Sequence, residues 1–204
     1  MTRGFLPLLA LVIAAGTTTL GWGTDGFRVV TTEGARRLAF ERHAPAVPEI
    51  TLIDQDGVRF SPGSYRGKVV LVDFIYTSCP TICGLLGAGF SGVLDVLQRE
   101  GADARQIDLL SVSFDQARDG PAELKAYGDR FGARSPRWRI AVPATEAGLR
   151  MLLRTFGVVV IPDAFGGFTH NGAFFLIDRD GRIVRILDAS LPAVAVVRAA
   201  RSVS

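Results

Sequence analysis

The chain has 204 residues, of which 48% are hydrophobic and 21% are charged, a composition that suits one globular domain with a tail or an anchor. The formal net charge is only +3, and the arginines are scattered along the chain without a dense basic run. We therefore expect no nucleic-acid partner. With only two cysteines, the fold does not depend on a disulfide framework.

The first 22 residues predict a signal or a membrane anchor. Residues 5–22 carry no charge, follow Arg3, and are apolar at their centre. A short basic start, an apolar run and small residues at 14–16 are typical of a cleaved secretory signal. The uncharged run also approaches the length of a spanning helix, although the threonines at 17–19 weaken its second half. We favour an exported protein anchored in the membrane and facing the periplasm. A soluble periplasmic protein is the alternative if the segment is cleaved.

A polar, irregular stretch follows this segment. Residues 23–44 precede Pro45 and Pro48, and we predict that they form a linker between the anchor and the domain. His43 falls in this linker, and we interpret it as a solvated histidine. The remaining residues, 45–204, show no internal repeat and are expected to form one domain.

Apolar runs and turn residues within the domain predict strands that alternate with helices. Asp-Gly turns at residues 56–57 and 180–181 each join two strands into a hairpin. In chain order, the expected strands are 50–54, 58–60, 69–76, 107–112, 138–142, 174–178 and 183–187. The expected helices are 82–97, 121–131, 145–156 and 191–201. This order predicts an α/β domain with a mixed central sheet flanked by helices.

Single residues mark several boundaries. Asp119 and Thr145 are expected to cap the helices that follow them, because Asp and Thr side chains accept hydrogen bonds from unpaired backbone N–H groups. Gly132 and Gly157 are expected to end those two helices. Residues 158–169 contain a proline and paired glycines, and we predict a loop there.

The two cysteines are the strongest candidates for chemistry. Cys79 and Cys83 follow the buried apolar run 69–76, and Pro80 between them suits the first turn of a helix. They are therefore expected where a central strand ends and a helix begins, which is where open α/β sheets place functional residues. At a helix N-terminus, the helix dipole and the unpaired N–H groups should lower the pKa of Cys79.

A spacing of four residues leaves several roles open. On one face of a helix the two Cβ atoms are roughly 6 Å apart, which suits two thiolates that bind one soft metal ion. The pair can also form a disulfide if the first turn adjusts, because a bridge needs a Cβ separation of about 3.8 Å. A purely structural disulfide is disfavoured, since closing so small a loop removes little chain entropy. Metal binding, thiol–disulfide exchange, or both remain as candidates.

His170 is the one imidazole of the predicted domain, and it limits the kind of metal site. A structural zinc site requires four ligands, whereas Cu(I) accepts two or three soft or borderline ligands. His170 directly follows the loop 158–169, and that loop can bring it to the carboxyl end of the sheet beside the cysteines. A surface histidine without a ligand role is the alternative.

Three stretches resemble the SCO/SenC family of copper proteins, which have thioredoxin-like folds. They are Gly67 to Cys83 with its Tyr-Thr-x-Cys-Pro-x-x-Cys core, Ser111 to Pro121, and His170 with the apolar run 174–178. The resemblance covers roughly residues 45 to 190. It implies a thioredoxin-like fold and a site in which Cys79, Cys83 and His170 bind copper as Cu(I) or Cu(II).

The resemblance also implies partners and reveals departures. Members of the family help to assemble the dinuclear copper centre of cytochrome c oxidase, so the expected partner is the copper-bearing subunit of the oxidase or another copper chaperone. Asp115 matches an acidic position of the family. Gly84 replaces a frequent proline, and Thr169 replaces an acidic residue that would orient the ligating imidazole. Gly172 stands where thioredoxins and peroxiredoxins carry a proline, which argues against an ordinary thioredoxin-type reductase.

The sequence thus favours a copper-binding metallochaperone with Cys79, Cys83 and His170 as metal ligands. The alternative is an exported thiol–disulfide oxidoreductase that keeps partner cysteines reduced, in which Cys79 attacks and Cys83 resolves the intermediate. Removal of peroxide is disfavoured, because the sequence near Cys79 offers no cation to activate a peroxidatic thiol.

Overall fold

The structure is a computed structural model that describes residues 5–24, 31–79, 82–101, 106–164 and 166–203. The chain divides into two compact units, Met1–Arg42 and His43–Ser204. The second unit begins close to the predicted domain boundary at residue 45, and the assignment of the preceding residues to an anchor and a linker stays a prediction. Pro80, predicted in the first turn of a helix, lies outside the described residues.

The described residues of the N-terminal unit form two helices. In α1 (Phe5–Gly23), the hydroxyl groups of Thr18 and Thr19 donate hydrogen bonds to carbonyl groups one turn back. None of the helices in the described ranges combines the length and the apolar composition needed to cross a membrane. α2 (Thr32–His43) corrects the expectation of irregular structure before residue 44. It is rich in good helix formers, and Thr31 Oγ1 accepts a hydrogen bond from a backbone N–H of its first turn.

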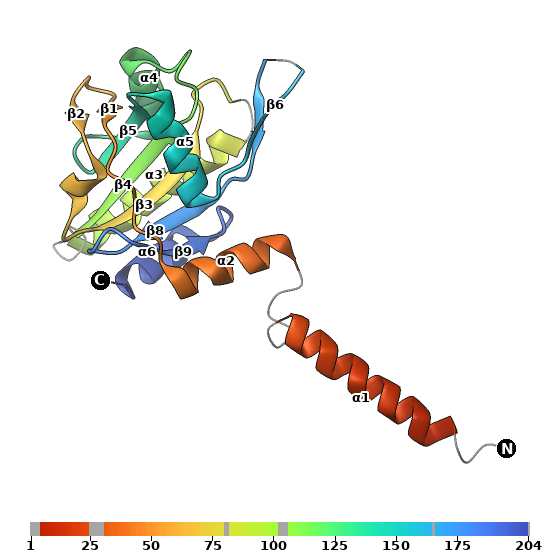
Figure 1. Ribbon diagram of the computed structural model, residues 1–204. Coiled ribbons are helices and arrows are strands. Elements are labelled where there is room, and N and C mark those ends of the chain that lie inside the picture. Colours follow the sequence, from red (N-terminus) through yellow and green to blue (C-terminus); the bar gives the residue numbers. More distant parts are fainter. Residues whose placement is uncertain (1–4, 25–30, 80–81, 102–105, 165, 204) are drawn as a thin grey trace. The chain divides into compact units, whose positions relative to one another are not determined.

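A mixed seven-stranded sheet forms the centre of the second unit, in the order β2-β1-β5-β4-β3-β8-β9 (Figure 1). Its middle strands β3 (Val69–Ile75), β4 (Ile107–Ser113) and β5 (Trp138–Pro143) run parallel to one another. Every residue of β3 and β4 is buried, which explains the nearly continuous apolar run of β3; β4 also buries the polar residues Asp108, Ser111 and Ser113.

Two antiparallel hairpins complete the sheet, as the Asp-Gly turns predict. β1 (Leu52–Asp54) pairs with β2 (Arg59–Phe60) and with β5, and β8 (Phe174–Ile177) pairs with β9 (Ile183–Leu187) and with β3. A glycine with a positive φ lies in each turn, where residues with a side chain would be strained.

Helices cover both faces of the sheet (Figure 1). The described residues of this unit form the helices η1, a short 3-10 helix (Pro62–Tyr65), α3 (Ile82–Glu100), α4 (Pro121–Phe131), α5 (Glu146–Phe156) and α6 (Ala193–Arg201). On one face, Phe156 of α5 packs edge-on against Phe74 and Phe175, with ring centroids 5.1 Å from each. On the other face, Phe90 of α3 packs against Phe174 and Trp138, with ring centroids 4.9 and 5.6 Å away.

Two local expectations are wrong, while the expected cap of α5 is confirmed. Thr145 Oγ1 accepts a hydrogen bond from Gly148 N at 3.1 Å. In contrast, Asp119 does not cap α4: the N-cap is Gly120, whose N–H donates to the Glu123 carboxylate at 3.0 Å. Residues 158–169 were expected to form a loop. Instead, the backbone groups of β6 (Val160–Pro162) and β7 (Phe168–His170) pair with each other and form a second, two-stranded sheet.

The glycines of α3 provide a test of its packing. A Cβ atom on Gly87 would lie 2.6 Å from the Phe131 ring and 2.8 Å from Tyr127 Oη, so Gly87 lets α4 approach α3. No described atom lies within 4 Å of the corresponding position on Gly84. We expect Gly87→Ala to lower the free energy of unfolding by about 1–3 kcal/mol through overpacking, and Gly84→Ala to raise it by up to about 1 kcal/mol. Urea denaturation of both variants checks the pair, and equal effects would contradict this packing.

Candidate metal centre

Three distant segments meet at one edge of the central sheet. β3 and β4 are parallel and in register, with Ile75 opposite Ser113, so the residues that follow them leave the sheet at the same edge. β8 is antiparallel to β3, so the residues that precede it reach that edge from the other direction. The edge therefore collects the cysteine segment, the turn after β4 and the segment with His170.

The cysteines lie at the junction between β3 and α3, as predicted. Both are thiols; Cys83 is buried and Cys79 is partly exposed. The Cys79 N–H donates a hydrogen bond to Tyr76 O at 3.2 Å, which turns the chain sharply after the strand. The Cys83 N–H lies 3.4 Å from Cys79 Sγ, so the first cysteine accepts a hydrogen bond from the beginning of the helix.

His170 lies beside the second cysteine. Its Nε2 is 3.7 Å from Cys83 Sγ, although 87 positions separate the two residues. The imidazole packs edge-on against the rings of Phe114 and Tyr76, with centroids 5.0 and 6.5 Å away. Tyr127 Oη donates a hydrogen bond to Cys83 O at 2.8 Å and fixes the backbone of the cysteine from the α4 side. The expectation that the segment before His170 brings it to the cysteines is confirmed for Cys83.

Burial keeps this thiol and this imidazole neutral. It raises the pKa of Cys83 far above that of an exposed cysteine, and the neighbouring Cys79 and Asp73 raise it further. Burial also lowers the pKa of His170, which favours the unprotonated imidazole. A metal that binds Cys83 must therefore displace its proton, while His170 is ready to donate a lone pair.

The donors suit a soft metal, but they do not form a finished cage. The described residues include no group of three or more His, Cys, Asp or Glu side chains close enough together to hold a metal ion. Two sulfur atoms and one imidazole nitrogen nevertheless match the ligands that copper accepts. Nδ1 of His170 is buried without a hydrogen-bond partner among the described groups, and the rings of Phe114 and Tyr76 pack against the imidazole.

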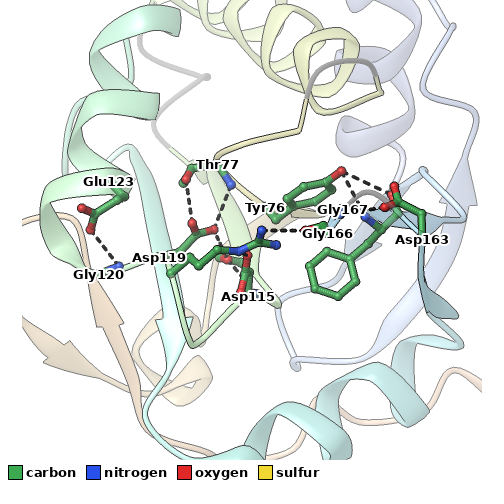
Figure 2. Close-up of polar contacts among 12 residues, drawn as sticks. Tyr76, Thr77, Asp115, Asp119, Gly120, Glu123, Asp163, Gly166 and Gly167 are labelled. Carbon is green, nitrogen blue, oxygen red and sulfur yellow. Dashed lines mark hydrogen bonds and ion pairs between the residues drawn. The ribbon is translucent and has the colours of Figure 1, made fainter.

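Asp119 is a buried residue of this edge whose role the sequence did not reveal. Its carboxylate accepts hydrogen bonds from Thr77 N at 2.8 Å, Thr77 Oγ1 at 2.6 Å and Ser113 Oγ at 2.5 Å (Figure 2). Asp119 thereby ties the turn after β4 to the chain just before Cys79. In the sequence, the only signal for these contacts was an acidic residue shortly after a buried strand. A helix cap accounts for an acidic residue at that position equally well.

Comparison with known proteins identifies the family. The model of the family described as SCO1/SenC matches residues 40–203. The chain belongs to the SCO1/SenC family. A curated SCO1/SenC relative, the SCO1 protein homolog of Bacillus subtilis (strain 168), is 28% identical over 141 residues, which are 68% of this chain and 72% of the relative.

Solved SCO structures confirm the predicted thioredoxin-like fold. ScoI of Bradyrhizobium japonicum, solved with copper bound, is 26% identical and has a TM-score of 0.66, covering 78% of this chain and 100% of that one. BsSco, described as a cytochrome c oxidase assembly protein with a disulfide switch, is 24% identical and has a TM-score of 0.69, covering 79% of this chain and 94% of that one.

Two residues near His170 differ from related patterns: Thr169 departs from the SCO1/SenC pattern, and Gly172 departs from the thioredoxin and peroxiredoxin pattern. Thr169 lies between Phe168 and His170 on β7, and side chains alternate along a strand, so its exposed side chain points away from the face that carries the imidazole. An acidic residue at this position would project the same way. Gly172 packs against α3: a Cβ atom there would lie 2.9 Å from Ile82 Cγ1.

Asp73 is a buried carboxyl group of β3 near the site. It is fully buried on the face covered by α3, and neither of its carboxyl oxygens has a hydrogen-bond partner among the described groups. Burial raises its pKa to about 7, an effect that the nearby Ser111 hydroxyl opposes only in part. Between pH 4 and 7 the folded chain therefore holds a proton on Asp73 that the unfolded chain has lost.

This difference in protonation makes stability fall as pH rises through that window. Asp73→Asn removes this contribution, so the stability of the variant relative to the parent should increase from pH 4 to 7 and level off above. Urea denaturation at a series of pH values measures the difference, with Asp95→Asn, at an exposed position of α3, as the matched control. A constant difference between Asp73→Asn and the parent at every pH would contradict the assignment.

Proposed function

We propose that the chain is a copper-binding metallochaperone whose ligands are Cys79, Cys83 and His170. The observation that carries the proposal is the 3.7 Å contact between Cys83 Sγ and His170 Nε2, with Cys79 Sγ next to the Cys83 backbone. It brings two soft sulfur donors and a neutral imidazole to one edge of the sheet. Three ligands fall short of the four that a structural zinc site requires, whereas Cu(I) accepts two or three soft or borderline ligands.

The two cysteines differ in burial, and this difference should affect how copper binds to the site and leaves it. The buried Cys83 binds copper only by releasing its proton, so affinity should rise with pH. The partly exposed Cys79 lies closer to solvent, and it is the sulfur that an incoming ligand from a partner reaches first. Copper is the cargo, and a three-ligand site leaves it open to such a ligand.

The proposed recipient is the copper-bearing subunit of cytochrome c oxidase, at its dinuclear copper centre, or another copper chaperone. The copper-bound relative ScoI and the oxidase-assembly relative BsSco support this role. We further propose that residues 1–22 direct export, so that the site faces the periplasm. A basic residue followed by an uncharged run and then small residues supports this placement.

Copper titration of the full-length chain in mild detergent tests the ligand set. The parent should bind one copper ion per chain. His170→Ala should weaken Cu(II) binding by more than about tenfold and change the visible spectrum, because the imidazole is lost from the site. His43→Ala, at the exposed end of α2, is the matched control for the only other histidine. Equal affinity and spectra for His170→Ala and the parent would refute the three-ligand site.

A thiol–disulfide oxidoreductase is the second candidate, favoured by the close approach of the two cysteines and by the disulfide switch described for BsSco. In this reaction the Cys79 thiolate attacks a partner disulfide and releases one partner thiolate. The Cys83 thiolate then attacks Cys79 Sγ, which forms the Cys79–Cys83 disulfide and releases the second partner thiol. Burial of Cys83 slows the second step, because its thiolate is scarce near neutral pH.

Trapping with Cys83→Ser distinguishes this candidate from the chaperone. An oxidoreductase lacking its resolving thiol should accumulate a mixed disulfide between Cys79 and an oxidised peptide that carries two cysteines, visible by non-reducing electrophoresis. His170→Ala should retain most of the reductase activity, since the imidazole takes no part. If the parent fails to reduce the peptide and no adduct forms, the reductase role is excluded and the chaperone role stands alone.

A further inference from the structure

The hairpin that carries His170 stands apart from the main sheet. β6 and β7 form hydrogen-bonded pairs only with each other among the described strands. At its base, the Asn171 side chain accepts a hydrogen bond from Val159 N at 2.7 Å and donates one to Gly157 O at 3.1 Å. Those bonds secure the end next to α5, but they do not hold the rest of the hairpin against the cysteine segment.

Aromatic packing holds the face of the hairpin that His170 shares. Phe168 lies edge-on to Tyr76 and Phe114, with ring centroids 5.2 and 5.5 Å away. Tyr76 Oη lies 3.3 Å from both the N and the O atoms of Phe168 and can bond either one. Ring packing is not directional, and the tyrosine hydroxyl contacts the backbone only at Phe168, so these contacts leave the hairpin tip to be held by another residue.

Arg118 supplies a directional contact to the hairpin tip. Its Nη1 donates a hydrogen bond to Gly166 O at 2.6 Å, and its guanidinium lies 5.3 Å from the centre of the Phe168 ring. Its Nε forms an ion pair with Asp115, whose carboxylate is buried. The planar guanidinium can make all three contacts at once, which a lysine ammonium cannot.

The turn that carries Arg118 also contacts the cysteine half of the site. Backbone N–H groups of Arg118 and Asp119 both donate to Asp115 O, at 3.2 and 2.9 Å, so the turn is compact. Asp119 then binds Thr77, two residues before Cys79, while Arg118 binds Gly166, four residues before His170 (Figure 2). A single turn therefore contacts the two segments that must meet to form the site.

We infer that Arg118 is a positioning residue that latches the β6–β7 hairpin and thereby holds His170 beside Cys83. The importance of this latch for copper rests on the proposed function, whereas the latch itself is a property of the copper-free chain. Arg118 is not a ligand, because its guanidinium has no lone pair to donate. Loss of the latch should let the hairpin move away from the cysteines and leave copper with the two sulfur ligands.

Full-length Arg118→Ala, Arg118→Lys and the control Arg99→Ala, an exposed arginine of α3, test the latch. In copper-free protein, amide hydrogen exchange of β7 should become at least about tenfold faster in Arg118→Ala, intermediate in Arg118→Lys and unchanged in the control. Groups that hydrogen-bond directly to a metal ligand contribute about 10–100-fold to affinity, and Arg118 acts on the hairpin instead of on the imidazole, so Cu(II) affinity of Arg118→Ala should fall by up to about tenfold. Its Cu(II) spectrum should shift toward that of His170→Ala, and Arg118→Lys should recover part of the shift.

The copper-free and copper-loaded measurements test the Arg118 latch separately from the role of His170 as a copper ligand. Unchanged exchange in β7 together with an unchanged copper spectrum in Arg118→Ala would overturn the latch. Faster exchange in Arg118→Ala, combined with equal copper binding by the parent and His170→Ala, would support the latch and refute His170 as a ligand. A fall in thermal stability of Arg118→Ala without faster exchange confined to β7 would count against the latch, since it indicates a general structural role.

Discussion

The pairing of β3 with β4 in parallel and with β8 in antiparallel is the constraint on which the site depends. It requires the chain to leave β3 and β4, and to enter β8, at one edge of the sheet. Cys79 and Cys83 follow the first of these strands, and His170 precedes the last, so the sheet brings together donors that are remote in sequence. The aromatic residues Tyr76 and Phe114, each the first residue beyond its strand, then pack around the imidazole.

Much of this arrangement was predictable, because the signals for it are local. Continuous apolar runs mark the buried strands, and Asp-Gly turns mark the hairpins. The approach of His170 to the cysteines was predicted from its place shortly before a strand of the sheet, although the preceding segment forms a hairpin instead of the expected loop. The role of Asp119 was not predictable in the same way: its partner Thr77 lies 42 positions away, while a helix begins two residues after it, so the local signal for a cap dominated. β6 and β7 were missed because they are only three residues long and contain a proline and little apolar alternation.

The chemistry of the site follows from burial more than from charge. Burial raises the pKa of the Cys83 thiol and lowers that of the His170 imidazole, so the two groups meet as neutral partners rather than as an ion pair. Such a pair is poorly suited to rapid thiol exchange, which needs a thiolate, and well suited to a metal that displaces the thiol proton. The copper role and the redox role use the same sulfur atoms, and they differ in whether His170 takes part.

X-ray absorption at the copper K-edge, measured on the copper-loaded full-length chain, tests this account most directly. The account predicts a first shell that contains sulfur from both cysteines together with the outer-shell scattering of a single imidazole, and the loss of that imidazole signal in His170→Ala. A shell of sulfur alone in the parent, or an imidazole signal that survives His170→Ala, would contradict the claim that the sheet edge assembles a Cys79, Cys83 and His170 copper site.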